Sequence, residues 1–161
     1  MISLRLALAG FAESWSHCGA VADYVARYAA SDRFDPEGLT TRLSSFLNEV
    51  LELIYANHGA DRGGAKEGPP VLAIDVTREE SALHVACALP ADDAVASAFE
   101  RALAGLDDPD LRSRYRDGFD AGLDEARVEA PFLEMAGVHG IAPVLNRSGD
   151  HVVVRLTIPA E

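Results

Sequence analysis

Two β-rich runs joined by a short polar segment constrain the fold of this chain more than any other feature. The runs are VLAIDV (residues 71–76) and ALHVACAL (residues 82–89), and the segment between them is TREES. Valine and isoleucine are enriched in strands, and a short polar connection between two such runs is typical of a β-hairpin. The strands of a hairpin pair antiparallel, so we expect an antiparallel sheet.

Strand patterns also lie at both ends of the chain. Apolar residues recur at every second position in residues 2–8 and again in residues 151–159. This period of two is that of a strand with one buried face. The first run has no basic leading region and contains Arg5, so a strand fits it better than a signal peptide.

Helical periodicity fills the long segment between the first strand and the hairpin. Residues 14–30 carry apolar side chains three and four positions apart, which predicts an amphipathic helix. A second helix is expected from about Pro36 to about His58, because Asp35 suits the N-cap and proline suits the first helical position. Residues 59–70, rich in glycine and proline, are expected to form a loop.

Two further helices are expected between the hairpin and the last strand. One follows the second hairpin strand, with Asp92 or Asp93 as its N-cap. Another begins in LDDPDLRSRYRDGFDAGL (residues 106–123), where the same order of aspartate and proline recurs. Residues 131–150 predict a glycine-containing loop followed by a short helix that starts near Gly140.

This order of elements predicts an α+β fold for residues 1–161 as a single domain. A chain of 161 residues has the ordinary size of one domain, and its 48% hydrophobic and 25% charged residues are typical of a globular protein. We therefore expect a two-layer sandwich, with helices on one face of a mainly antiparallel sheet.

The charge balance argues against two classes of partner. The chain has 26 acidic and 14 basic residues, which gives a formal charge of -12. Since nucleic acids and anionic membranes are bound by clustered cations, neither is expected as a partner. No apolar run approaches the roughly 20 residues that span a bilayer. Cys18 and Cys87 form no CxxC motif, which favours a reducing, cytoplasmic location.

The second helix contains the first candidate catalytic residue. On a helical wheel, most apolar residues of FLNEVLELIYANHG (residues 46–59) gather around Val50, and Glu49 lies at the edge of that stripe beside Leu53. A partly desolvated carboxylate at this edge would have the raised pKa that a general base needs. The alternative is a solvated residue on the flank of a core helix.

The order of elements and LNEVLEL (residues 47–53) resemble the GHKL superfamily of ATP-binding domains, which includes histidine kinases and anti-sigma kinases. More narrowly, residues 46–59, residues 106–123 and GVHGI (residues 137–141) are similar to the SiaB-like branch of bacterial partner-switching regulators. The resemblance covers most of the chain and implies a Bergerat-type fold. It matches Glu49 to the glutamate that acts as general base.

Two departures from the superfamily pattern concern the nucleotide. In the superfamily, an asparagine four residues after the glutamate coordinates the Mg²⁺ that bridges the phosphates. Leu53 occupies that position and has no oxygen for a hard cation, while Asn57 lies one turn further on. The Asp-x-Gly-x-Gly adenine motif is also missing from ACALPADD (residues 86–93). We therefore expect no metal site and no resident cofactor.

Gly137 and Gly140 form a candidate phosphate loop. If a helix starts near Gly140, its free backbone amides could bind an anion. His139 lies between the two glycines and is the histidine that we expect nearest a ligand. The alternative is that the glycines serve tight packing and that His139 is an exposed loop residue.

Other motifs are incomplete. GADRGGAK (residues 59–66) begins like a P-loop but lacks the lysine followed by serine or threonine. His84 and Cys87 are three apart on a strand and so face opposite sides, which argues against a shared metal. RSRYRDGF (residues 112–119) is rich in arginine and aromatic residues and is a candidate protein-binding surface. The alternative is that its arginines are solvated or paired with Asp110 and Asp117.

Two functions fit these observations. The first is a bacterial signalling domain with a GHKL-like scaffold that is not an enzyme and acts by binding a protein partner in a regulatory switch, with a homodimer left open. The second is an ATP- and Mg²⁺-dependent serine kinase, with Glu49 as base and Gly137, His139 and Gly140 at the phosphates. Leu53 favours the first. An unrelated α+β binding domain or enzyme is the remaining alternative.

Overall fold

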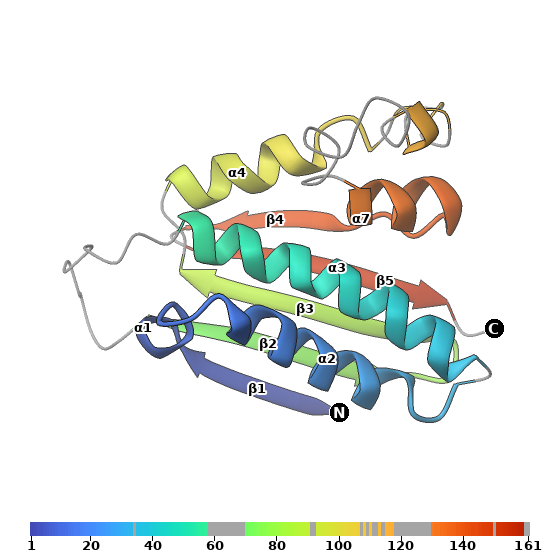
Figure 1. The fold of residues 1–161 in the computed structure, drawn as a ribbon, viewed down its shortest axis with the longest axis horizontal. Helices are drawn as coiled ribbons and strands as arrows, with labels where there is room; N and C mark the ends of the chain where they lie inside the picture. The colour runs from blue at the N-terminus through green and yellow to red at the C-terminus, as the bar shows by residue number, and fades with distance from the viewer. Residues whose placement is uncertain are drawn as a thin grey trace.

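A five-stranded antiparallel sheet forms one layer of the computed structural model (Figure 1). The structure describes residues 1–33, 35–57, 70–90, 93–106, 108, 110, 113, 115–117, 130–149 and 151–159. Its strands are β1 (Ile2–Ala7), β2 (Val71–Arg78), β3 (Ala82–Pro90), β4 (Val144–Ser148) and β5 (His151–Pro159). They lie in the order β1-β2-β3-β5-β4, and each neighbouring pair is antiparallel.

The helices form a second layer on one face of the sheet (Figure 1). They are α1 (Leu8–Phe11), α2 (Ser16–Ala30), α3 (Pro36–Asn57), α4 (Asp93–Leu103), α7 (Ala130–Leu133) and the π-helical turn η1 (Glu134–Val138). Helix α3 lies between α2 on one side and α4 and α7 on the other. The predicted α+β architecture, with helices on one face of an antiparallel sheet, is confirmed. None of the helices in the described ranges is long and apolar enough to cross a membrane.

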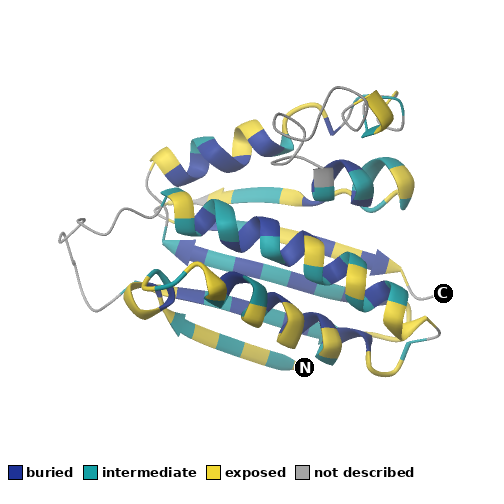
Figure 2. Ribbon diagram, viewed as in Figure 1, coloured by how far each residue is buried: buried dark blue, intermediate teal, exposed yellow. Residues whose placement is uncertain are grey.

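One hydrophobic core fills the space between the two layers (Figure 2). Strand β5 buries every second residue, as its alternation predicts. From the helical layer, Leu43, Leu47 and Val50 of α3 are fully buried. Phe46 of α3 packs edge to face against Phe132 of α7, with ring centroids 5.4 Å apart. This contact joins α7 to the centre of the helical layer.

Helix α3 begins as the sequence predicts. The Asp35 carboxylate accepts a hydrogen bond from the backbone amide of Gly38 at 3.0 Å, which satisfies one of the free donors of the first turn. Pro36 is the first helical residue, where its missing N–H costs nothing. The predicted end of the helix, at His58 and Gly59, lies outside the described residues.

The segment before the last strand differs from its prediction. The helix expected near Gly140 is wrong, since residues 144–148 form β4, and the helical turns of α7 and η1, which contain Gly137, end before Gly140. Ser148 pairs directly with His151, and Gly149 has φ of +60°, so β4 and β5 form a hairpin with a two-residue connection. Glycine followed by aspartate before HVVV is a hairpin signal of this kind.

Smaller differences occur at other element ends. Leu8 belongs to α1, which was not predicted, so β1 ends one residue earlier than its alternation indicates. Strands β2 and β3 are longer than predicted and reach Arg78 and Pro90. The helix expected after β3 is confirmed as α4, with Asp93 as its first residue. The loop expected at residues 59–70, except Pro70, and most of the helix expected from 106 to 123 lie outside the described residues.

Candidate functional site

Glu49 is a buried carboxyl in the middle of α3. It is 9% exposed and is the single charged residue classed as buried in the described part of the chain. Burial raises its pKa from 4.5 to about 7, and the negative charge of Glu52 adds to this effect. The wheel placed Glu49 at the edge of the apolar stripe, and the structure shows that it is buried there.

The rest of α3 supplies no metal site around Glu49. Leu53, one turn further on, packs against the core. Asn57 donates a hydrogen bond from its amide nitrogen to the Leu53 carbonyl at 2.8 Å, so its side chain is held against its own helix. No group of three or more metal-ligating side chains occurs within the described ranges. Glu49 therefore lies without the oxygen ligands that Mg²⁺ would need beside it.

The glycine segment does not form the N-terminus of a helix. Gly137 lies within η1, and the amides of His139 and Ile141 donate to the carbonyls of Glu134 and Met135 at 3.3 and 2.8 Å. These amides close the end of a helical turn and are not free for an anion, so the physical basis of the predicted phosphate loop is lost. Gly140 has φ of +68°, which favours glycine there.

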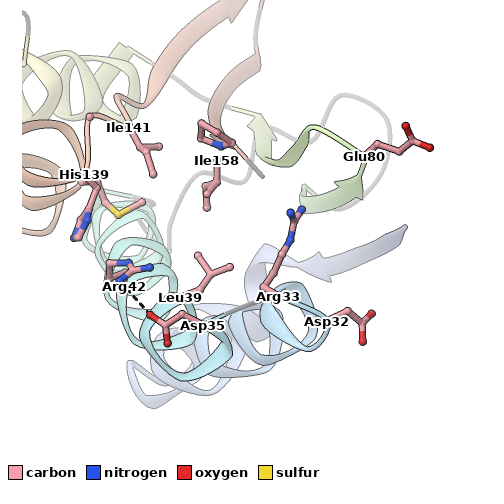
Figure 3. Close-up of a pocket in the computed structure, with 12 residues that line it drawn as sticks. Asp32, Arg33, Asp35, Leu39, Arg42, Glu80, His139, Ile141 and Ile158 are labelled. Atoms are coloured by element: carbon pink, nitrogen blue, oxygen red, sulfur yellow. Dashed lines mark ion pairs between the residues drawn. The ribbon is translucent and has the colours of Figure 1, made fainter. Parts of the chain in front are cut away.

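The same segment lines a cavity of about 420 Å³ at the N-terminal end of α3. We call this cavity the α3 pocket (Figure 3). Residues from the turn after α2, from α3, from the end of η1 and from the end of β5 meet there. The defining residues are Arg33, Leu39, Arg42, His139, Ile141 and Ile158.

Basic side chains stand on two sides of the α3 pocket (Figure 3). Arg42 and His139 lie on one side, and Arg33 extends along the other. Arg42 contacts Asp35 at 3.8 Å, which is a loose ion pair, and the His139 ring lies 3.9 Å from the Glu134 carboxylate. Arg33 has no ion pair or side-chain hydrogen bond with any described residue.

Arg78 of β2 fixes the end of α2 that carries Arg33. Its guanidinium pairs with the Asp32 carboxylate at 2.5 Å, donates to the Ser31 hydroxyl at 2.9 Å and also donates to the Tyr28 carbonyl. It lies 4.7 Å from the centre of the Tyr28 ring. The chain at the rim of the pocket is therefore held to the sheet by a group of polar contacts.

The structure brings together part of the predicted site. His139 and Gly140 both line the α3 pocket, whereas Glu49 does not. Arg33 and Arg42 also line the pocket, but the sequence pattern did not predict them as site residues. A signal for Arg42 exists, because it precedes Glu49 by seven residues and so lies on the same side of α3. Arg33 carries no such signal, since its position depends on the turn between α2 and α3.

The cysteines and the other histidine motif do not form a second site. Burial raises the pKa of the Cys18 thiol to about 11, with a further contribution from Glu52, and raises that of Cys87 to about 12. Neither is a thiolate at neutral pH, as a nucleophile would need to be. His84 faces outward and Cys87 inward, as predicted for residues three apart on a strand.

Two sequence motifs fall on parts of the chain that the structure does not describe. The P-loop-like residues 59–66 lie outside the described ranges, as do Arg112, Arg114 and Phe119 of the candidate protein-binding surface. Comparison of the chain with protein-family models, curated proteins and solved structures gives no match.

Proposed function

We propose that this chain is a bacterial regulatory domain with a GHKL-like two-layer arrangement, located in the cytoplasm, that binds a protein partner and transfers no phosphate. The observation that carries the proposal is an open face of the sheet. All described helices cover one face, and no described element covers the other (Figure 1). A flat surface of this kind suits a second protein better than a small substrate.

The centre of the open face consists of small apolar side chains. Ala73 pairs with Ala88 across β2 and β3, and Ala88 pairs with Val153 across β3 and β5, so the three form a continuous row. Ala86 lies beside this row on β3, and all four are half-buried. Small side chains allow another sheet to approach to about 10 Å, the usual spacing of packed sheets.

Charges beside this row match a second copy of the chain. Asp75 pairs with Ala86, which pairs with Arg155, so opposite charges flank β3 symmetrically. A half-turn about an axis parallel to β3 would place Asp75 of each copy opposite Arg155 of the other. Arg155 is exposed and has no ion pair with a described residue, while Asp75 is held in place by Arg5 at 2.9 Å. The partner that this face fits is therefore a second copy.

Charge reversal tests this dimer. The wild-type chain should sediment as a dimer in analytical ultracentrifugation. Arg155→Asp and Asp75→Arg should each weaken self-association at least about tenfold, because each places like charges opposite one another. Mixing the two variants should restore a dimer, since the mixed pair again has opposite charges in both places. Arg101→Asp, on the exposed side of α4, is the control and should stay dimeric.

A monomeric wild-type chain, or a dimer that Arg155→Asp leaves unchanged, would contradict the proposed partner. Failure of the mixed pair to associate would contradict the proposed symmetry. Circular dichroism of each variant should show an unchanged fold, since both positions lie on the open face of the sheet.

The nucleotide position on α3 supports the absence of phosphate transfer. Leu53 replaces the oxygen ligand, and Asn57 is bonded to its own helix. We expect no binding of a fluorescent ATP analogue with Mg²⁺ up to millimolar concentration. Micromolar affinity in this titration would contradict the non-catalytic part of the proposal.

A specific observation favours the alternative of an active serine kinase. A general base works best with a pKa near the working pH, and that of Glu49 is about 7. Under this alternative, the wild-type chain binds ATP, Glu49→Gln retains binding and loses phosphotransfer, and Leu53→Asn binds Mg²⁺-ATP more tightly. Under our proposal, none of the three proteins transfers phosphate in a radiolabelled ATP assay.

A further inference from the structure

We propose that the α3 pocket binds a compact molecule that carries an oxyanion, a carboxylate or a phosphate, on an apolar body. This proposal does not depend on the regulatory function above, because the pocket lies within the helical face of the chain and away from the open face of the sheet. Three features of the pocket carry it: an apolar floor, two guanidinium groups that face the cavity, and acidic groups that do not.

The floor of the α3 pocket is the end of the hydrophobic core. Leu39 and Ile158 are each 7% exposed, Met135 is 2% exposed, and Ile141 packs against them. The cavity of about 420 Å³ lies within the size range of small-molecule sites. A ligand that fills it must therefore present apolar surface to this floor, or leave the floor in contact with water.

Two guanidinium groups are available to a ligand. Arg33 extends along one side of the cavity and makes no ion pair with a described residue, and Arg42 on the other side holds Asp35 only at 3.8 Å (Figure 3). The planar fork of a guanidinium matches the two oxygens of a carboxylate or phosphate. An anion between the two arginines would accept charge-assisted hydrogen bonds from their guanidinium groups.

The acidic residues at the rim are turned away or already bonded. Asp32 and Glu80 point outward from the cavity (Figure 3). The Asp32 carboxylate is paired with Arg78 at 2.5 Å. Asp35 accepts the amide of Gly38 in the first turn of α3. Its other oxygen lies 3.8 Å from Arg42, so among the described lining residues Asp35 is the one acidic group beside the arginines, and its charge is already shared. The remaining charged groups that face the cavity, Arg33 and Arg42, are basic, although the whole chain carries a formal charge of -12.

This net charge explains why the apolar body is needed. A bare anion is repelled by the chain as a whole and gains little from two solvated arginines. Burial of a methylene group on the floor strengthens binding about fourfold by the hydrophobic effect, as long as the cavity has room. Headgroup and body are both required for measurable affinity.

Isothermal titration calorimetry with four probes tests the proposal. Octanoate and octyl phosphate carry both features, octan-1-ol has only the apolar body, and acetate has only the anion. We expect octanoate or octyl phosphate to bind at least about tenfold more tightly than octan-1-ol or acetate. Whichever of octanoate and octyl phosphate binds more tightly shows whether the pocket prefers a carboxylate or a phosphate headgroup.

Arginine variants locate the site. Arg33→Gln and Arg42→Gln should each weaken binding of the tighter probe at least about tenfold, because each removes a charged donor while keeping a side chain of similar length. Arg27→Gln, at an exposed position on α2, is the matched control and should bind as the wild type does. Circular dichroism confirms that each variant is folded.

Two results would overturn the proposal. One is the absence of binding by both octanoate and octyl phosphate to the folded wild-type chain. The other is binding that Arg33→Gln and Arg42→Gln leave unchanged, which would assign the probe to another apolar surface. The monomeric Arg155→Asp variant should retain the affinity, so failure of the pocket and failure of the proposed dimer are separate outcomes.

Discussion

Replacing Phe132 with alanine should lower the free energy of unfolding by about 3–4 kcal/mol, because a fully buried aromatic ring leaves a cavity in the core. The ring packs edge to face against Phe46, with an interplanar angle of 76°. A domain of this size is stable by only about 5–15 kcal/mol, so the loss is a large fraction of the total. Chemical denaturation followed by circular dichroism measures it.

The energy of the contact between the Phe46 and Phe132 rings can be separated from that of general core packing. Phe132→Leu keeps most of the volume and should cost only about 1 kcal/mol. A double-mutant cycle with Phe46→Leu and Phe132→Leu should show a coupling of about 0.5–1.5 kcal/mol between the rings. A cost below about 1 kcal/mol for Phe132→Ala would mean that α7 does not pack on α3 as described.

The same contact matters for the α3 pocket. Helix α7 continues directly into η1, which carries Met135 and ends at His139. The position of this wall therefore depends on the ring of Phe132 against α3. Because leucine keeps most of the buried volume and so the contact with α3, we expect Phe132→Leu to stay folded and to leave probe binding nearly intact.

The elements that were predicted correctly carry several signals that agree. Helix α3 has an N-cap aspartate, a proline at its first position and a long apolar stripe, and each of these is local. Strands β2 and β5 are rich in valine and isoleucine, and β5 also alternates clearly. Strand β3 follows β2 after a short polar connection, as the second strand of a hairpin does. Local agreement of this kind leaves little choice of structure.

The elements that were missed or mistaken are short or ambiguous. Strand β4 has five residues and follows Gly140 and Pro143, which obscure its alternation. Residues 144–148 form a strand because they pair with β5. The sequence predicts that pairing only if Gly149 is recognised as a turn residue. Helix α1 has four residues, too few for a helical period.

The candidate site was harder to predict than the fold. The α3 pocket is formed by segments that are up to about 125 residues apart in the sequence, from Arg33 to Ile158, with Arg42, Glu80 and His139 between them. No local pattern brings such residues together. The helical wheel placed Glu49 at the edge of the apolar stripe and left a solvated position open, and the structure shows the carboxyl buried. The wheel gives no information about what lies across from a side chain.

That carboxylate leads to the second large effect, on stability as a function of pH. The pKa of Glu49 is about 7 in the folded chain and near 4.5 when unfolded, so the folded state binds the proton more tightly. The contribution of Glu49 to the free energy of unfolding is therefore greatest below about pH 4.5, and it falls as the pH rises towards and through 7. At about 1.4 kcal/mol per pKa unit, the free energy of unfolding that is lost through Glu49 approaches 3 kcal/mol above about pH 8.

Glu49→Gln removes this titration while keeping the shape of the side chain. The variant should be more stable than the wild type by about 2–3 kcal/mol at about pH 8.5, with a midpoint of thermal unfolding higher by about 5–9 °C. The gain should shrink towards zero at about pH 4, below both pKa values, where the wild-type carboxyl is protonated in the folded and in the unfolded state. Thermal unfolding at both pH values, followed by circular dichroism, measures this difference.

Two control variants separate Glu49 from the general acidity of the chain. Glu100→Gln, at an exposed position on α4, should change stability little at either pH. Glu52→Gln removes the neighbouring charge that raises the pKa of Glu49, so part of the stability lost above neutral pH should return. An equal gain from Glu49→Gln at both pH values would show that the carboxyl does not titrate near 7. That result would also remove the observation that favours a kinase, because a base with an ordinary pKa would be ionised throughout.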